Sequence, residues 1–182
     1  NYEVSRSLTA CEGAVLLVDA SQGVEAQTIA NAYLAIDAGL EIIPVINKID
    51  LPNAMVDDCR QQLEDSLGIS GKSALLVSAK DGTGVKDLLE AVITLVPPPK
   101  GDVNEPLKCL IFDSFYDTYR GVIPHIRVFS GALKHGDKMM IKSTGQIHEV
   151  DEVGYFTPQV TPNEIILAGE VGYVGAIIKK VG

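Results

Sequence analysis

Three short apolar runs among the first hundred residues, at 13–18, 41–46 and 74–77, each end abruptly in polar residues. In an open parallel sheet, ligands bind in the loops at the carboxyl ends of the strands, so these three exits are the places where binding chemistry is expected. The first exit begins at Asp19. The other two exits supply the candidate binding residues, namely Asn47, Lys48, Asp50, Ser78, Ala79 and Lys80.

The residue types at these two exits match the needs of a guanine base. The carboxylate of Asp50 can accept hydrogen bonds from both N1–H and the exocyclic amine of guanine, a charge-assisted arrangement that adenine cannot satisfy. The amide of Asn47 can face N7 and O6 and tie neighbouring loops together. The methylenes of Lys48 can lie along the base, and the backbone N–H of Ala79 can donate to O6. Adenine would leave such polar groups unpaired, so the pattern predicts guanine selectivity.

The signal lies in the pair of motifs rather than in either one. An Asn-Lys-x-Asp tetrapeptide occurs often in ordinary turns, and alone it is weak evidence for a nucleotide site. Here it follows a predicted buried strand, and Ser-Ala-Lys stands at the exit of the next predicted strand, about 30 residues later. Both groups are therefore expected at one edge of the same sheet.

Two glycine-containing stretches do not fit a phosphate-binding loop. Such a loop requires G-x-x-x-x-G-K-[ST] between a strand and a helix. Residues 71–73 read Gly-Lys-Ser, but the position five before Gly71 is Ser66, a predicted helix precedes, and a predicted strand follows. Residues 82–87 are interpreted as a turn and a helix start.

The histidines and cysteines suggest neither catalysis nor metal binding. The histidines have no neighbouring nucleophile or carboxylate pattern, and we expect structural roles for His125, His135 and His148. The three cysteines are far apart and form no CxxC pair, which argues against a disulfide framework and a zinc site. A reducing cytoplasm is the default location.

Composition excludes several classes of function. The chain has 182 residues, 46% of them hydrophobic, and can bury a sizeable core. A net charge of −9 gives no long-range attraction for nucleic acid, so no DNA partner is expected and any RNA contact must rest on a local basic patch. No apolar stretch approaches the roughly 20 residues needed to span a bilayer, and no leader pattern opens the chain.

The first part of the chain predicts an α/β fold. Its short apolar runs alternate with segments of helical period at 53–67, where Gly68 is a stop signal, and at 85–96, which Pro97 ends. Alternating strands and helices predict a parallel sheet covered on both faces. We assign residues 1–97 to this domain.

The second part of the chain has a different pattern. Residues 97–106 read PPPKGDVNEP, which can neither continue a helix nor lie inside a sheet, so we predict a linker at 98–106. Strand-like runs separated by glycine-bearing turns follow at 107–113, 121–129, 137–143, 146–156 and 171–180. We predict a small antiparallel β-barrel over residues 107–182.

The opening residues predict that the chain begins within a helix. Val4, Leu8 and Cys11 recur at i, i+4 and i+7, which indicates an amphipathic helix leading into the strand at 13–19. That strand would then lack a neighbour on one side and leave an apolar edge. We therefore expect the sequence to be part of a longer protein.

These motifs resemble those of translational GTPases. NKID (47–50) and SAK (78–80) are similar to the two guanine-specificity motifs of GTPases, and residues 18–28 resemble the segment that follows the switch II helix. Residues 113–158 closely resemble the second domain of the elongation factor 4 family, also called LepA. The resemblance covers essentially the whole chain.

The resemblance implies the C-terminal part of a P-loop-GTPase-type domain followed by an elongation-factor-like barrel. It also implies GTP and GDP as ligands, Mg²⁺ as cofactor of the full-length protein, the ribosome, both its RNA and its proteins, as partner, and a cytoplasmic location. Peripheral association with the inner membrane is left open. The turn pattern shared with the family's barrel is structural: Gly131, Leu133, Gly136 and Asp137.

The family's phosphate-binding loop, its magnesium-binding threonine and its Asp-x-x-Gly-His stretch have no counterpart in this sequence. Because GTP hydrolysis rests on phosphate positioning and charge stabilisation, we assign no catalytic or metal residue and expect the chain alone to be inactive. One alternative is a noncatalytic module that docks on the ribosome. Another is part of a BipA-like or EF-G-like factor, which the match over 113–158 disfavours.

Overall fold

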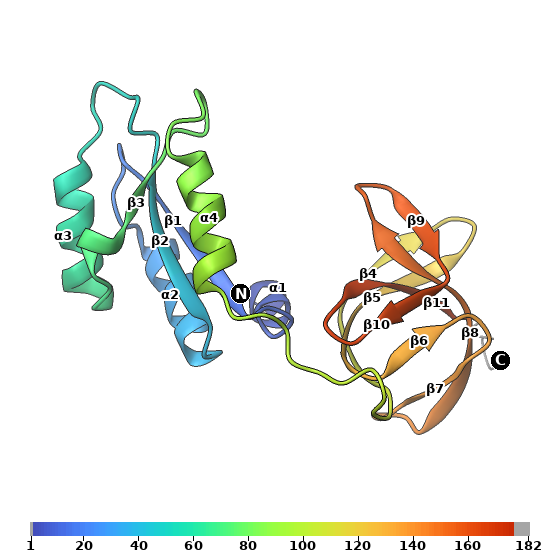
Figure 1. The fold of residues 1–182 in the computed structure, drawn as a ribbon. Coiled ribbons are helices and arrows are strands. Elements are labelled where there is room, and N and C mark those ends of the chain that lie inside the picture. The colour runs from blue at the N-terminus through green and yellow to red at the C-terminus, as the bar shows by residue number, and fades with distance from the viewer. Residues whose placement is uncertain (1, 177–182) are drawn as a thin grey trace. The chain divides into compact units, whose positions relative to one another are not determined.

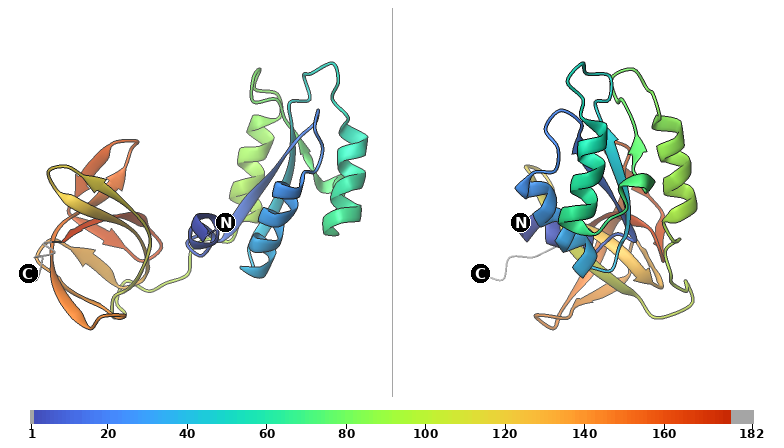
Figure 2. Two further views of the ribbon diagram at one scale, coloured as in Figure 1. Left: turned by 180° about the vertical axis from the view of Figure 1, so that it is seen from behind. Right: turned by 90° about the vertical axis from the view of Figure 1, so that its left-hand side faces the viewer.

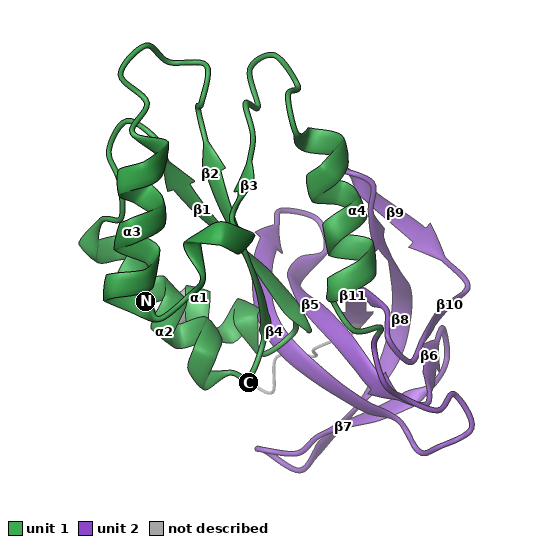
Figure 3. Cartoon of the chain, turned by 60° about the vertical axis from the view of Figure 1, so that its left-hand side comes forward, with its two compact units in different colours: residues 1–98 green, residues 99–182 purple. Residues whose placement is uncertain are grey.

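The computed structural model describes residues 2–176, which divide into two compact units at 98/99 (Figure 3). Unit 1 comprises residues 1–98 and is a three-layer α/β structure. Unit 2 comprises residues 99–182 and is all β within its described part. The residues expected to form a linker, 98–106, contain no helix or strand.

Unit 1 is built on a short parallel sheet in the order β1-β2-β3 (Figure 1). Its elements in chain order are α1 (Tyr2–Leu8), β1 (Gly13–Asp19), α2 (Ala26–Asp37), β2 (Glu41–Asn47), α3 (Val56–Leu67), the 3₁₀ turn η1 (Gly71–Ser73), β3 (Leu75–Leu76) and α4 (Val85–Leu95).

Helices cover both faces of this sheet. On one face, α2 and α3 pack on β1 and β2, and the buried residues there include Val18, Ile46 and Leu63. On the other face, α4 packs on β2, where Ile43 and Val45 are buried. β2 is therefore the central, doubly covered strand, which accounts for its nearly continuous apolar sequence.

A proline lies inside this central strand. Pro44 pairs with Leu16 of β1, whereas β3 pairs with β2 only at Val45 and Ile46. At Pro44 the strand therefore has a partner on one side alone, and the missing N–H removes no bond to β3. The brevity of β3 and the proline in β2 are thus compatible.

β1 is the edge strand of the described sheet, and its outer face is partly uncovered. Val15 and Leu17 are the register partners of Ile43 and Val45. Although those partners are buried under α4, Val15 is 45% and Leu17 54% exposed. One face of β1 therefore carries exposed apolar side chains.

Several elements of unit 1 differ from the sequence-based expectation. The first helix ends at Leu8, so Cys11 lies outside it and is exposed, whereas Ala10 in the following turn is buried. The third helix begins at Val56 rather than 53, because a turn precedes it and the Met55 N–H donates to the Ala20 carbonyl at 2.7 Å.

Unit 2 is a curled antiparallel sheet with a small companion sheet (Figure 2). The main sheet has the order β4-β5-β11-β8-β7, with β9 on β8, and β6 pairs with β10. The strands are β4 (Lys108–Asp117), β5 (Gly121–Ser130), β6 (Ala132–Lys134), β7 (Lys138–Ile141), β8 (Gln146–Phe156), β9 (Val160–Asn163), β10 (Ile165–Leu167) and β11 (Val171–Ala176).

The concave side of the curled sheet holds the core of unit 2. This core comprises the buried side chains of Ile126, Val128, Leu133, Met139, Val150, Val153, Ile166 and Val174. β6, β9 and β10 were not among the expected strands, and β4 runs four residues further than expected, to Asp117. The predicted strand at 171–180 is present from 171 to 176, and its remainder lies outside the described residues.

In unit 2, the residues of the predicted turn pattern lie in turns or in the core. Leu133 is fully buried, and the side chain of Asp137 accepts a hydrogen bond from the Lys134 N–H at 2.9 Å. Gly131 and Gly136 both have positive φ. None of the helices in the described part of the chain is long and apolar enough to cross a membrane.

Candidate functional site

The strand exits of unit 1 lie together at one edge of the sheet. Asp19 and Asn47 end β1 and β2 as register partners, and the Ala20 N–H donates to the Asn47 carbonyl at 2.8 Å. On the other side of β2, the Val77 N–H donates to the Ile46 carbonyl at 2.9 Å. The parallel pairing thus brings together segments that are about 30 residues apart in sequence.

Asp50 is oriented by Ser78. The Ser78 hydroxyl donates to Asp50 Oδ1 at 2.8 Å, and Ser78 is fully buried. The other carboxylate oxygen, Oδ2, lies 3.9 Å from the ammonium of the exposed Lys80. A carboxylate oxygen can accept more than one hydrogen bond, so Asp50 keeps acceptor capacity for a ligand.

Asn47 links the same two loops through its side chain. Its Oδ1 accepts a hydrogen bond from the Ala79 N–H at 3.0 Å. This bond joins the two loops, as expected. It also occupies the Ala79 N–H, which we had expected to donate to O6 of guanine. The side-chain NH₂ of Asn47 is consequently the donor available to a ligand beside it.

Lys48 adopts an unusual backbone conformation and forms a close ion pair. Its φ is 64°, a left-handed value found at no other non-glycine residue in the described chain. Its ammonium lies 2.6 Å from Asp19 Oδ2. This contact is the main reason why the pKa of Asp19 falls from 3.8 to about 2, with hydrogen bonds from Ser21 adding to it. The same ion pair raises the pKa of Lys48.

A cavity of about 260 Å³ opens between these loops. It is lined by Asn47, Lys48, Asp50, Leu51, Ala79 and Lys80. Five of the six predicted residues therefore line one cavity. The sixth, Ser78, does not line it but donates a hydrogen bond to Asp50. Pockets for drug-sized ligands have volumes of about 300–1,000 Å³, so this cavity suits a single heterocycle rather than a whole nucleotide.

Sequence reasoning missed two residues of this site. Leu51 lines the cavity, and the apolar type directly after Asp50 was the only available signal. Asp19 was recognised as a strand exit but not as a partner of Lys48, because the pairing depends on side-chain direction. Neither residue belongs to the two motifs from which the site was predicted.

None of the remaining sequence candidates is among the residues that line this cavity. Gly71–Ser73 form a 3₁₀ turn that leads into β3, rather than a loop from a strand into a helix. His125 lies among Phe112, Phe115 and Phe156, and His135 contacts the Asp151 carbonyl.

The described residues contain no cluster of metal-ligating side chains. No group of three or more His, Cys, Asp or Glu side chains among them is arranged to hold a metal ion. The sequence also has no G-x-x-x-x-G-K-[ST] loop, whose hydroxyl would bind Mg²⁺. No step of a reaction is therefore assigned to a metal bound by this chain.

Unit 1 matches a known protein family. The family model described as the elongation factor Tu GTP binding domain matches residues 1–98, which is more than half of the chain. The chain belongs to this family. The match ends at the residue where the structure divides unit 1 from unit 2.

Curated relatives match this sequence over its whole length. Elongation factor 4 of Thermotoga maritima is 60% identical over 181 residues, covering 100% of this chain and 29% of the relative. Elongation factor 4 of Clostridium botulinum (strain Hall) is 58% identical, and that of Listeria monocytogenes (serotype 4a) is 57% identical, each over 100% of this chain and 30% of the relative. The resemblance to elongation factor 4 is thus confirmed, and the chain spans about 30% of the length of these relatives.

Proposed function

We propose that this sequence is the base-recognising part of a translational GTPase of the elongation factor 4 type, which binds GTP and hydrolyses it on the ribosome. The observation that carries the proposal is the convergence of two guanine-type motifs on one cavity. Asp50 reads N1–H and the exocyclic amine, Asn47 faces N7 and O6, and Lys48 covers one face of the ring. Ser78 orients Asp50, and Ala79 and Lys80 complete the wall.

The chemistry of hydrolysis belongs to residues outside this sequence. Phosphoryl transfer in GTPases depends on positioning of the phosphates and on stabilisation of charge by a phosphate loop, Mg²⁺ and a water-orienting group. This chain has no such loop. Its part in the reaction is to select guanine and fix the nucleotide by its base, and by itself it is inactive. The proposed location of this translation factor is the cytoplasm.

Calorimetric titration with GDP tests the proposal. The 182-residue chain should show no binding at micromolar concentrations, because the phosphates have no loop to hold them. A protein that also carries the preceding part of the GTP-binding domain should bind GDP and hydrolyse GTP, faster with ribosomes. Failure of the longer protein to bind or turn over GTP would refute the proposal, and micromolar binding by the short chain would refute the stated division of roles.

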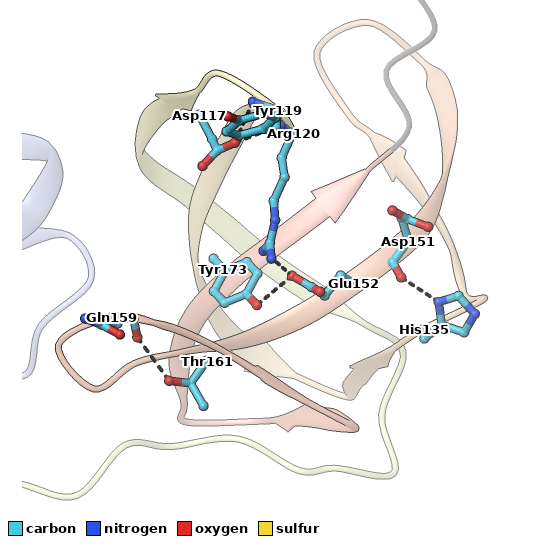
Figure 4. Close-up of polar contacts among 9 residues, drawn as sticks. All are labelled: Asp117, Tyr119, Arg120, His135, Asp151, Glu152, Gln159, Thr161 and Tyr173. Atoms are coloured by element: carbon cyan, nitrogen blue, oxygen red, sulfur yellow. Dashed lines mark hydrogen bonds and ion pairs between the residues drawn. The ribbon is translucent and has the colours of Figure 1, made fainter.

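A second candidate function for this chain, docking on the ribosome through unit 2, is favoured by the β4–β5 hairpin (Figure 4). Tyr116 is 72% and Tyr119 97% exposed near its tip. Arg120 is tied back to Glu152 at 2.6 Å, and Glu152 also accepts a hydrogen bond from the Tyr173 hydroxyl at 2.7 Å. Exposed aromatic rings on a rigid hairpin suit stacking with unpaired RNA bases.

The two functions are compatible, and one substitution separates them. In the full-length protein, replacing Tyr119 by Ala should weaken ribosome binding in co-sedimentation and leave GDP affinity unchanged. Unaltered co-sedimentation of that variant would count against docking through this hairpin. Loss of GDP binding would show instead that the change disturbs the whole protein.

A further inference from the structure

The side chain of Lys48 is fixed at both ends. At its base, the left-handed backbone at φ 64° sets the direction in which the side chain leaves the loop. At its far end, the ammonium lies 2.6 Å from Asp19 Oδ2. A lysine stem has four flexible carbons and an ammonium that is otherwise strongly hydrated, so an anchor at the nitrogen is what limits the positions of the methylenes.

Asp19 divides its two carboxylate oxygens between two tasks. Oδ1 accepts hydrogen bonds from the Ser21 N–H at 2.8 Å and from the Ser21 hydroxyl at 2.7 Å. Oδ2 meets Lys48. The bonds from Ser21 hold the carboxylate in one orientation, so Oδ2 is aimed at the neighbouring loop before any ligand arrives.

The loop that carries Asp19 is itself held by α3. The Gly23 N–H donates to the Asp19 carbonyl at 2.8 Å, and the Val24 N–H donates to Gln62 Oε1 at 2.7 Å. Cys59 of the same helix is fully buried, with Sγ 3.9 Å from the Ala20 carbonyl. These contacts with a packed helix hold the turn, and with it the Asp19 carboxylate, in place.

We propose that Asp19 is a positioning residue of the guanine site, which holds the Lys48 ammonium so that the lysine methylenes form a preformed surface for one face of the base. This inference rests on the proposed function. Asp19 touches no ligand in this arrangement, and it acts through Lys48 alone. It belongs to neither of the two guanine motifs.

The proposal separates affinity from selectivity. A hydrocarbon surface over the ring plane contacts every purine equally, whereas Asp50 alone distinguishes guanine by its exocyclic amine. Loss of Asp19 should therefore weaken the binding of GDP and of IDP by the same factor, because inosine differs from guanosine only in lacking that amine. Loss of the Asp50 carboxylate should instead change the ratio of the two affinities.

A double-mutant cycle in the full-length protein tests this role by titration with fluorescent GDP and IDP. Asp19→Asn is nearly isosteric and keeps an oxygen for the Ser21 N–H, but it removes the charge that holds Lys48. Lys48→Met keeps an apolar stem without the ammonium. Because the ion pair is partly exposed, Asp19→Asn should weaken GDP binding by only about fivefold. The ratio of the GDP and IDP affinities should not change. In the Lys48→Met background, Asp19→Asn should have no further effect.

Asp57→Asn is the matched control, since it makes the same change at an exposed acid of α3 that does not line the cavity; it should leave GDP affinity unchanged. The inference is overturned if Asp19→Asn has no effect, if its effect is equally large with Lys48→Met, or if it alters the GDP/IDP ratio. If the unmodified full-length protein does not bind GDP, the proposed function fails first, and this inference falls with it.

Discussion

At the residue scale, the proposed recognition of guanine depends on which oxygen atoms of Asp50 can accept hydrogen bonds and on which groups orient them. Ser78 supplies a hydroxyl to Asp50 Oδ1 from a fully buried position, so the carboxylate is oriented without consuming its remaining lone pairs. In the proposed site, the hydrogen bonds to guanine would be charge-assisted on the acceptor side, which makes such bonds stronger than neutral ones. A change of one acceptor into a donor should therefore invert the preference of the site.

We predict that Asp50→Asn in the full-length protein converts the site from guanine to xanthine. The amide donates to the C2 carbonyl of xanthine and accepts from N1–H, while facing the exocyclic amine of guanine with a donor. The affinity for GDP should fall by roughly 10- to 100-fold, as expected for about 1–3 kcal/mol per unpaired polar group, and the affinity for XDP should rise. Competition titrations with GDP and XDP measure both. Asp57→Asn, an exposed acid on α3, is the control, and an unchanged GDP/XDP ratio for Asp50→Asn would contradict this placement of Asp50.

The Asp19 carboxyl should titrate with a pKa of about 2 in the folded chain. Its folded pKa lies below the ordinary value, so the stabilisation it provides is fully present above about pH 4 and is lost as pH falls through about 2. Carbonyl ¹³C shifts of the aspartates followed through an acid titration give this value directly. In Lys48→Met the pKa of Asp19 should rise toward 3.8, though the bonds from Ser21 hold it somewhat lower. A pKa that does not respond to loss of Lys48 would show that the ion pair is absent in solution.

At the element scale, the strongest sequence patterns were the most accurate. The apolar runs at 13–18 and 41–46 match β1 and β2 to within one residue, because both strands are apolar runs bounded by polar exits. β3 has only two residues, because its partner β2 lies beside it only at Val45 and Ile46. α2 was not predicted, although its buried Ala32 and Ala35 lie on one face. Small residues mark a buried helix face less clearly than large apolar ones do.

The turn between β3 and α4 gives an element-scale prediction, because it holds the Ser78–Lys80 loop. Gly84 has φ 71°, and a Cβ there would lie 2.1 Å from the Leu76 carbonyl oxygen. Gly84→Ala should therefore lower the free energy of unfolding by roughly 2–4 kcal/mol, from left-handed strain plus overpacking. Gly82→Ala in the same turn is the control: its φ is 87°, but nothing lies within 4 Å of the added methyl group, so roughly 1–2 kcal/mol is expected. Urea unfolding measures both, and equal losses would show that the contact with Leu76 is unimportant.

At the scale of the whole molecule, the candidate site belongs to unit 1 alone. Every residue that lines its cavity lies between 47 and 80. The sequence was sufficient to predict that these residues lie together, because both motifs follow strands of one parallel sheet and parallel pairing aligns their exits. It was not sufficient to predict the contacts between Asp19 and Lys48 or between Asn47 and Ala79. Those depend on side-chain directions and on a left-handed residue, which no periodicity encodes.

The core clusters of the described chain also divide by unit, and this gives a prediction for its stability. Leu63 is fully buried in a cluster formed only by residues of unit 1, and Leu133 is fully buried in one formed only by residues of unit 2. Truncating either leucine to Ala removes buried methyl groups and leaves a cavity, at a cost of about 2–5 kcal/mol to its own unit. Since neither cluster shares a residue with the other, the loss should stay local.

Hydrogen exchange followed by mass spectrometry measures this, because its peptides report each unit separately. Leu63→Ala should accelerate exchange in β1, β2 and α3 and leave β5 and β8 unchanged, and Leu133→Ala should do the reverse. Each variant thus serves as the control for the other. If Leu63→Ala accelerated exchange in β5 as much as in β2, the two units would unfold as one cooperative structure rather than separately.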